Sequence, residues 1–248
     1  MSGLNSFTKD VLRGLGLELR RLKYVNSEET VVPAVLAHAR PVAVLDVGAN
    51  VGQYAALVRK LGFEGMIVSF EAIPEVHAQL IAASAGDSKW VVAPCAALGR
   101  EHRQVEFHIA GNSVSSSVLP MNAAHLDAAP NSAYVGTQVL QMHRLDDLAA
   151  GLLPAAGPVV LKIDTQGYER EVLAGSTALL PRVAALQIEV SLVPLYDGAP
   201  SFTEMVSFVE RLGFAIFSFV PGLRNQKDGR LLQMDAFFIR ESSSGTPS

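Results

Sequence analysis

Two acidic and glycine-containing motifs stand where apolar runs of the sequence end, and their residue types suit a small polar ligand. Asp46 to Gly52 reads D-V-G-A-N-V-G and follows an apolar run over 42–45. Gly48 permits a tight turn and a close approach of the backbone to a ligand. Glu71 ends a second apolar run, where a carboxylate can accept hydrogen bonds from both ribose hydroxyls. This combination predicts a ligand that carries adenosine.

The same loop argues against a dinucleotide. The fingerprint G-x-G-x-x-G has a second glycine that admits the pyrophosphate, and Asn50 stands at that position. S-adenosylmethionine carries adenosine without phosphates and fits the motif better. Two alternatives to an enzyme that uses S-adenosylmethionine stay open: a methyltransferase-like binding module without activity and, with less support, a nicotinamide-dependent oxidoreductase.

Two further carboxylates follow apolar runs and are candidates for a reacting centre. Asp164 follows the run over 159–163 and could either organise the reacting end of a cofactor or cap the next helix. Glu189 also follows an apolar run, and a carboxylate in such surroundings should be paired or bound to a ligand. It could face the same crevice as Asp164, or form an ion pair with Lys162 or Arg182.

Apolar runs alternate with amphipathic segments from residue 41 onward, which predicts strands alternating with helices. We expect strands over 42–47, 65–70, 90–93, 105–109, 135–143, 159–163, 183–190, 214–220 and 233–239. We expect helices over 52–61, 74–84, 167–180 and 202–212. The pattern indicates an α/β fold with a mainly parallel sheet and helices on both faces. Ligands of such sheets bind beyond the carboxyl ends of the strands, where the candidate residues fall.

Three segments lie outside this alternation. Residues 111–134 are rich in Ser, Asn, Ala and Pro, and we expect a long loop that covers a ligand. Residues 4–23 carry an apolar stripe at helical spacing, which predicts a helix that packs on the main domain or in a homodimer. We therefore expect a helical extension over 1–30, one domain over 31–240 and a disordered tail over 241–248.

The composition excludes several classes of protein. The 248 residues are 49% hydrophobic and carry a net charge of −4, which argues against a nucleic-acid-binding face. The single cysteine cannot form an internal disulfide, which favours a reducing compartment. The mean hydropathy is +0.27, yet charges interrupt every apolar stretch before 18 residues. We expect a cytoplasmic protein without a transmembrane segment.

Several motifs together resemble the FkbM family of S-adenosylmethionine-dependent O-methyltransferases, which act on natural products and glycans. The motifs are D-V-G-A-N-V-G over 46–52, F-E-A over 70–72 with Pro74, A-A-L-G over 96–99, R-L-D-D over 144–147 and L-K-I-D-T-Q-G-Y-E over 161–169. The resemblance covers about residues 30–240. It implies a class I methyltransferase fold, Rossmann-like, with a seven-stranded sheet whose last strand, over 233–239, runs antiparallel.

The resemblance also implies which residues bind S-adenosylmethionine. Nine are expected to contact it: Asp46, Gly48, Asn50, Gly52, Glu71, Ala72, Ala96, Ala97 and Asp164. The segment 46–52 would line the methionine portion, Glu71 would hold the ribose, and Ala96 and Ala97 would lie beside the adenine. The acceptor would be a hydroxyl of a sugar, a glycolipid or a glycosylated natural product.

Methyl transfer to a hydroxyl needs alignment of the reactants and removal of a proton. His143 is the expected base, because imidazole titrates near physiological pH. Alternatively, Asp164 and Glu189 could bind Mg²⁺, with Asp235 as a third ligand, since Mg²⁺ accepts few protein oxygens and keeps several waters. We expect Asp164 and Glu189 to be catalytic with either arrangement, and His108 is a second candidate for the base.

Overall fold

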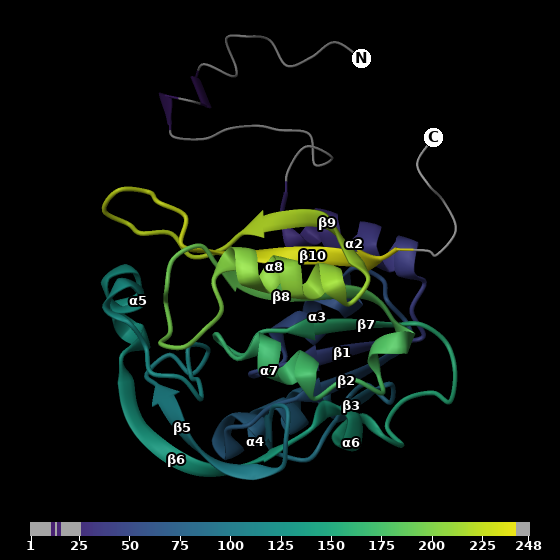
Figure 1. The fold of residues 1–248 in the computed structure, drawn as a ribbon. Coiled ribbons are helices and arrows are strands. Elements are labelled where there is room, and N and C mark those ends of the chain that lie inside the picture. The colour runs from purple at the N-terminus through teal and green to yellow at the C-terminus, as the bar shows by residue number, and fades with distance from the viewer. Residues whose placement is uncertain (1–10, 13, 16–25, 242–248) are drawn as a thin grey trace.

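The computed structural model describes residues 11–12, 14–15 and 26–241 (Figure 1). In chain order the named elements are α2 (Glu28–Ala39), β1 (Ala43–Val47), α3 (Gln53–Lys60), β2 (Met66–Phe70), α4 (Pro74–Ser84), β3 (Trp90–Val92), β4 (Ala97–Leu98), β5 (Arg103–Ala110), α5 (Ala123–Ala128), η2 (Pro130–Ser132), β6 (Tyr134–His143), α6 (Leu145–Ala149), β7 (Val159–Ile163), α7 (Glu169–Ala174), η3 (Leu180–Arg182), β8 (Val183–Ser191), α8 (Phe202–Arg211), β9 (Phe214–Pro221) and β10 (Gln233–Arg240).

Seven strands form the main sheet, in the order β3-β2-β1-β7-β8-β10-β9. Strand β1 pairs in parallel with β2 and with β7, and β7 pairs in parallel with β8. Strand β10 runs antiparallel to both of its neighbours. The predicted seven-stranded, mainly parallel sheet of the class I methyltransferase fold is therefore confirmed, and so is its antiparallel strand. The chain leaves β1 toward β2 and later returns to β7 on the other side, so the topological switch point lies at β1.

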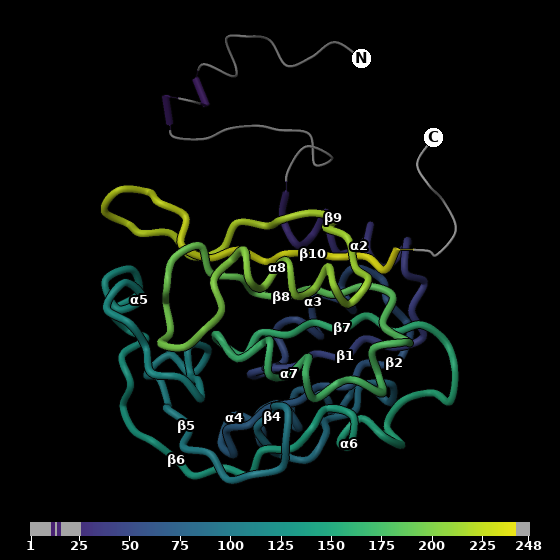
Figure 2. The backbone as a smooth tube through the Cα atoms, viewed as in Figure 1, coloured from purple at the N-terminus to yellow at the C-terminus, as the bar shows by residue number. Residues whose placement is uncertain are grey.

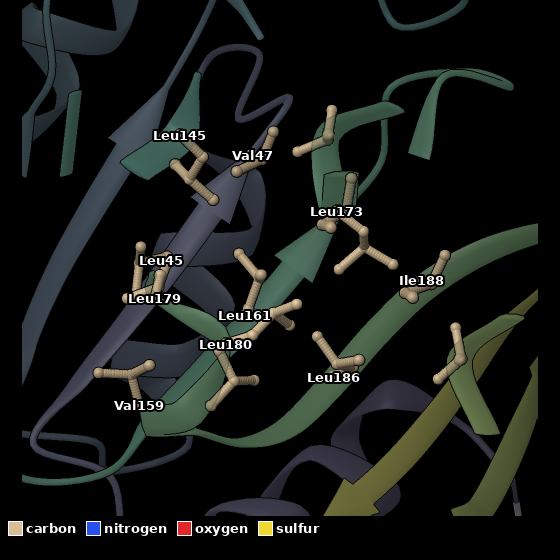
Figure 3. Packing of buried hydrophobic residues seen from close by; sticks show 14 of the residues in the cluster. Leu45, Val47, Leu145, Val159, Leu161, Leu173, Leu179, Leu180, Leu186 and Ile188 are labelled. Carbon is tan, nitrogen blue, oxygen red and sulfur yellow. The ribbon is translucent and has the colours of Figure 1, made fainter. Parts of the chain in front are cut away.

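Helices cover both faces of this sheet, because consecutive strand residues point to opposite sides and both sides are apolar. Val44 and Leu45 of β1 are fully buried, one in each of two core clusters. Figure 3 shows Leu45, Leu161 and Leu186 of three adjacent strands beside Leu173 of α7, in the cluster that also contains residues of α6 and α8. The other cluster joins the sheet to α2 and α3. The two apolar faces thus leave the strand ends as the place for polar groups.

A second sheet of three strands, in the order β4-β6-β5, stands apart from the first. Strands β5 and β6 lie near the predicted ranges 105–109 and 135–143, but they pair with each other and not with the main sheet. Figure 1 shows them curving together at the edge of the molecule. Figure 2 shows the connection between β9 and β10 projecting at the end of the main sheet where α5 also lies.

Several segments differ from expectation. Helix α2 was not predicted, because Pro33 lies inside it and proline is a helix-breaking signal in a sequence. The helix runs across the expected domain boundary at residue 30. The helix predicted over 167–180 ends at Ala174. The predicted loop over 111–134 contains α5 and η2. The predictions for 4–23 and for the tail fall almost entirely outside the described residues. Within the described residues, no helix is long and apolar enough to cross a membrane.

Candidate active site

A cavity of about 330 Å³ lies at the carboxyl ends of the central strands. Seven of the nine residues expected to bind the cofactor line it: Gly48, Asn50, Glu71, Ala72, Ala96, Ala97 and Asp164. Glu189 and Asp235 line it as well. The topology therefore brings most of the predicted site together at the switch point, as expected for a ligand site in an α/β sheet.

The turn after β1 requires glycine at 48. Gly48 has a φ of 73°, and a Cβ added there would stand 1.9 Å from the backbone oxygen of Asp164. The turns after β1 and β7 therefore approach each other more closely than any side chain at 48 would allow. Asn50 in the same turn also has a positive φ, of 48°, and its side chain amide donates to Ser113 Oγ at 2.9 Å.

Glu71 is held rigidly at the end of β2. Its Oε2 accepts a hydrogen bond from the backbone N–H of Asn50 at 2.9 Å, and its Oε1 accepts from those of Ala72 and Ile73 at 2.9 and 2.8 Å. Burial raises the pKa of the Glu71 carboxyl, while these three hydrogen bonds act in the opposite direction. The carboxylate is thus fixed in the cavity wall, and one lone pair of Oε2 remains for a hydroxyl donor.

Asp46 and Gly52, which were predicted to line the methionine portion, do not line the cavity. Asp46 is fully buried beneath it, and its Oδ1 lies 3.1 Å from Lys162 Nζ. Gly52 is the N-cap of α3, and a Cβ there would stand 2.6 Å from the Trp90 ring, so its role is close helix packing. Both motif residues therefore support the loop without lining the cavity. For Asp46 the reason is the strand register, which sets it beside Lys162.

Lys162 ties the two turns together. Its Nζ donates to the backbone oxygen of Gly48 at 3.2 Å and lies 3.6 Å from Asp164 Oδ2, in addition to its ion pair with Asp46. The sequence suggested Lys162 as a partner of Glu189, whereas the structure pairs it with Asp46 and Asp164. The residue was identifiable as a buried charge in an apolar strand, but its partners depend on strand order.

Gln166 joins the two carboxylates of the predicted reacting centre. Its Nε2 donates to Asp164 Oδ1 at 2.7 Å and to Glu189 Oε2 at 2.5 Å, and its Oε1 accepts from the Tyr196 hydroxyl at 2.5 Å. Its backbone is left-handed, with a φ of 55°. A non-glycine residue with such a φ carries strain that the surrounding contacts must offset. Sequence reasoning missed Gln166, since only the turn conformation directs its amide between the two acids.

The segment between β5 and β6 closes part of the cavity. Ser113, Val114, Ser116 and Val118 line it, as the loop prediction for this region expected. The segment is anchored to the β7 turn, because the Ser117 hydroxyl donates to the backbone oxygen of Gln166 at 2.8 Å.

The Methyltransferase FkbM domain matches residues 46–216, which include all five of the sequence motifs but not Asp235. The chain belongs to the FkbM methyltransferase family. It is therefore a class I methyltransferase that depends on S-adenosylmethionine. Comparison with curated proteins gives no match.

Solved structures that resemble this FkbM methyltransferase are distant. One is precorrin-6y C5,15-methyltransferase from Geobacter metallireducens, at 13% identity, with 90% of this chain and 93% of that chain covered and a TM-score of 0.44. Another is magnesium protoporphyrin IX methyltransferase from Synechocystis with bound S-adenosylmethionine, at 10% identity, with 97% and 100% covered and a TM-score of 0.45. The family assignment rests on the domain match.

The cavity of the FkbM methyltransferase fits its cofactor. Glu71 presents a carboxylate suited to the ribose hydroxyls, and Ala72, Ala96 and Ala97 form a wall of small apolar side chains suited to the adenine. The first turn of α3 faces the same end of the sheet, and its unpaired N–H groups favour a carboxylate. When bound, S-adenosylmethionine supplies an activated methyl group on a sulfonium.

The predicted Mg²⁺ site is not supported. The described residues contain no group of three or more His, Cys, Asp or Glu side chains arranged to hold a metal ion. Asp164 and Glu189 do approach each other, but the Nε2 donor of Gln166 bonds to both of them. An amide N–H₂ group between two acids takes the position that a cation would need, so the donor set does not suit Mg²⁺.

His143 lies outside the cavity lining. It is the last residue of β6 in the small sheet, and its Nδ1 lies 3.1 Å from the Nδ1 of His102. His102 in turn contacts Asp147 at 2.8 Å. His108 stacks on Tyr134 and does not line the cavity either. Neither histidine lines the cavity, although His143 pairs in register with Leu98, which does, so a role of either as base stays a prediction.

Carboxylates with raised pKa values gather on the side of the cavity formed by β7, β8 and β10. Burial and the neighbouring charges of Asp164 and Asp235 raise the pKa of Glu189 well above its ordinary value. Burial, with the charges of Asp164 and Glu28, raises the pKa of Asp235 to about 7. Asp235 and Glu189 are direct cross-strand partners, so their mutual repulsion follows from the register of β8 and β10.

Proposed function

We propose that this FkbM methyltransferase transfers the methyl group to a hydroxyl of a sugar, a glycolipid or a glycosylated natural product. The observation that carries the proposal is the carboxylate pair Asp164 and Glu189 in the cavity lining, bridged by the amide of Gln166. A weakly acidic hydroxyl needs a proton acceptor close to the reacting atoms.

Glu189 is the proton acceptor in this proposal. Burial and the neighbouring charges of Asp164 and Asp235 raise its pKa, which strengthens its tendency to take up and hold a proton. Asp164 stands at the end of β7 beside Gly48, where it orients the reacting end of the cofactor and the acceptor hydroxyl. Gln166 keeps the two carboxylates at a constant separation, so the hydroxyl meets an aligned pair.

The test is transfer of a labelled methyl group from S-adenosylmethionine to a panel of glycosides, with the methylated atom of the product identified by NMR. We expect labelled ether with the wild-type chain and a loss of about 100-fold or more in Glu189→Gln, the range typical of a general base. Glu210→Gln, an exposed carboxylate of α8 outside the cavity, is the matched control and should retain the rate.

Label found only on nitrogen or in base-labile esters would contradict the proposal. So would a protein that binds S-adenosylmethionine but methylates none of the hydroxyl acceptors, which would favour the binding-module alternative.

A further inference from the structure

The cavity has a strong excess of acidic side chains. Five carboxylates line it: Glu28, Glu71, Asp164, Glu189 and Asp235. Lys162 is the only basic side chain among the described residues of the lining, and its ammonium already pairs with the buried Asp46. S-adenosylmethionine with its carboxylate ionised carries one net positive charge, so it balances only part of this excess.

Three of the lining residues form a group of hydrogen-bond acceptors. Gln187 of β8 donates from Nε2 to Glu28 Oε1 at 2.9 Å and to Asp235 Oδ1 at 3.4 Å. These contacts use the N–H donors of the amide and leave its Oε1 as a free acceptor. Gln187 is 1% exposed, and its Oε1 has no hydrogen-bond partner among the described residues. A buried acceptor without a donor is costly, which indicates that a ligand supplies one.

This group lies away from the residues that anchor the cofactor. Glu71 ends β2 and Gly48 follows β1, whereas Gln187 and Asp235 belong to β8 and β10, two and three positions from β1 in the sheet. Neighbouring strands are about 4.8 Å apart, so these side chains start roughly 10–14 Å from the β1 turn. They therefore line the β8 and β10 side of the cavity, where Asp235 is the cross-strand partner of Glu189, the proton acceptor in the proposed function.

We infer that Glu28, Gln187 and Asp235, called here the amine subsite, bind a protonated amine on the acceptor. An ammonium group has three N–H donors and no acceptor, and the subsite offers two carboxylates and one unpaired amide oxygen. The inference rests on the proposed function and narrows it: the methylated hydroxyl belongs to an amino-bearing glycoside, such as an amino sugar. A neutral glycoside would bring no positive charge to the two carboxylates of the subsite.

The test uses matched pairs of acceptors that differ only in the amine. Glucosamine, galactosamine and neamine are compared with their N-acetylated forms, with labelled S-adenosylmethionine and the full chain. We expect kcat/KM for the free amines to exceed that for the acetylated partners by tenfold or more. Equal or better transfer to the acetylated forms would overturn the inference and leave the proposed function intact. If no pair accepts label on oxygen while a neutral glycoside does, the inference falls and the proposed function stands.

Substitution of Glu28 tests the subsite without touching Asp164 or Glu189. We expect Glu28→Gln to lower the ratio of amine to acetylated acceptor at least fivefold, mainly through KM of the amine. Glu210→Gln changes the net charge equally and should preserve the ratio, because Glu210 lies on α8 outside the cavity lining. An unchanged ratio in Glu28→Gln would overturn the inference even if the free amines are preferred.

Discussion

At the scale of single residues, the buried ammonium of Lys162 connects the turn after β1 to the turn after β7. Burial lowers its pKa, but the charges of Asp46 and Asp164 more than offset this and hold the pKa above its ordinary value. The carboxyl of Asp46 has a raised pKa because burial outweighs the attraction of Lys162. Each partner therefore depends on the other to remain charged inside the protein.

Removal of the lysine alone should be costly. We expect Lys162→Met to lower the free energy of unfolding by about 3–5 kcal/mol, because it leaves Asp46 buried without a counter-charge. Urea unfolding measures this difference. The double variant Lys162→Met with Asp46→Leu removes both charges and should recover part of the loss. A single variant as stable as the wild type would show that the pair is not what holds Asp46 in place.

At the scale of elements, the glycine turn between β1 and α3 depends on backbone freedom and on lack of a side chain. Gly48→Ala would meet the backbone of Asp164, whereas Gly62, with a φ of 90°, has nothing within 4 Å of an added Cβ. We expect Gly62→Ala to cost about 1–2 kcal/mol from its positive φ alone. Gly48→Ala should cost clearly more and should weaken binding of S-adenosylmethionine. Equal losses in urea unfolding would show that the close approach of the two turns is not required.

The elements of the main sheet could be predicted from the sequence because its strands are buried on both faces. Residues 159–163 form an uninterrupted apolar run except for Lys162, and the predicted strand matches β7. Most residues of β5 and β6 are exposed or half-buried, and the pairing of these strands into a separate sheet depends on contacts far apart in the chain. This pairing places His143 in the small sheet. The sequence alone does not reveal the pairing, so it could not show where His143 lies relative to the cavity, and its role as base stays a prediction.

The site residues also divide into those that the sequence could place and those that it could not. Gly48 and Glu71 follow strands with a known place in the sheet, so their positions at the cavity could be predicted. Gln166 and Gln187 could not, because an amide side chain has no sequence signal of its own. The partners of Gln166 follow from the φ of the turn at 166, and the contact of Gln187 with Asp235 follows from the pairing of β8 with β10.

At the scale of the whole molecule, buried carboxylates with raised pKa values make the fold sensitive to pH. Burial raises the pKa of Glu169 to about 7 from 4.5, although it accepts hydrogen bonds from the backbone of Thr165 and Gly167. Between these values the folded chain holds a proton that the unfolded chain releases. The contribution of Glu169 to stability is therefore complete below about pH 4.5 and is lost as the pH rises through 7.

Glu169→Gln tests this linkage, since its Oε1 can still accept the same hydrogen bonds. We expect the decrease in unfolding free energy between pH 5 and pH 8 to be smaller in the variant by about 2 kcal/mol. Chemical unfolding at several pH values measures the slope. A variant with the same slope as the wild type would mean that Glu169 is ionised in the folded state throughout this range.

The central claim is that the fold builds a cavity at the topological switch point in which Glu71 holds the ribose of S-adenosylmethionine. Calorimetric titration of the cofactor into the wild-type chain and into Glu71→Ala tests this most directly, with thermal unfolding to verify that the variant is folded. The account predicts that the wild type binds and that Glu71→Ala binds at least tenfold more weakly, as expected when a charged hydrogen-bond acceptor is lost. A wild-type chain that does not bind, or a folded variant that binds equally tightly, would contradict it.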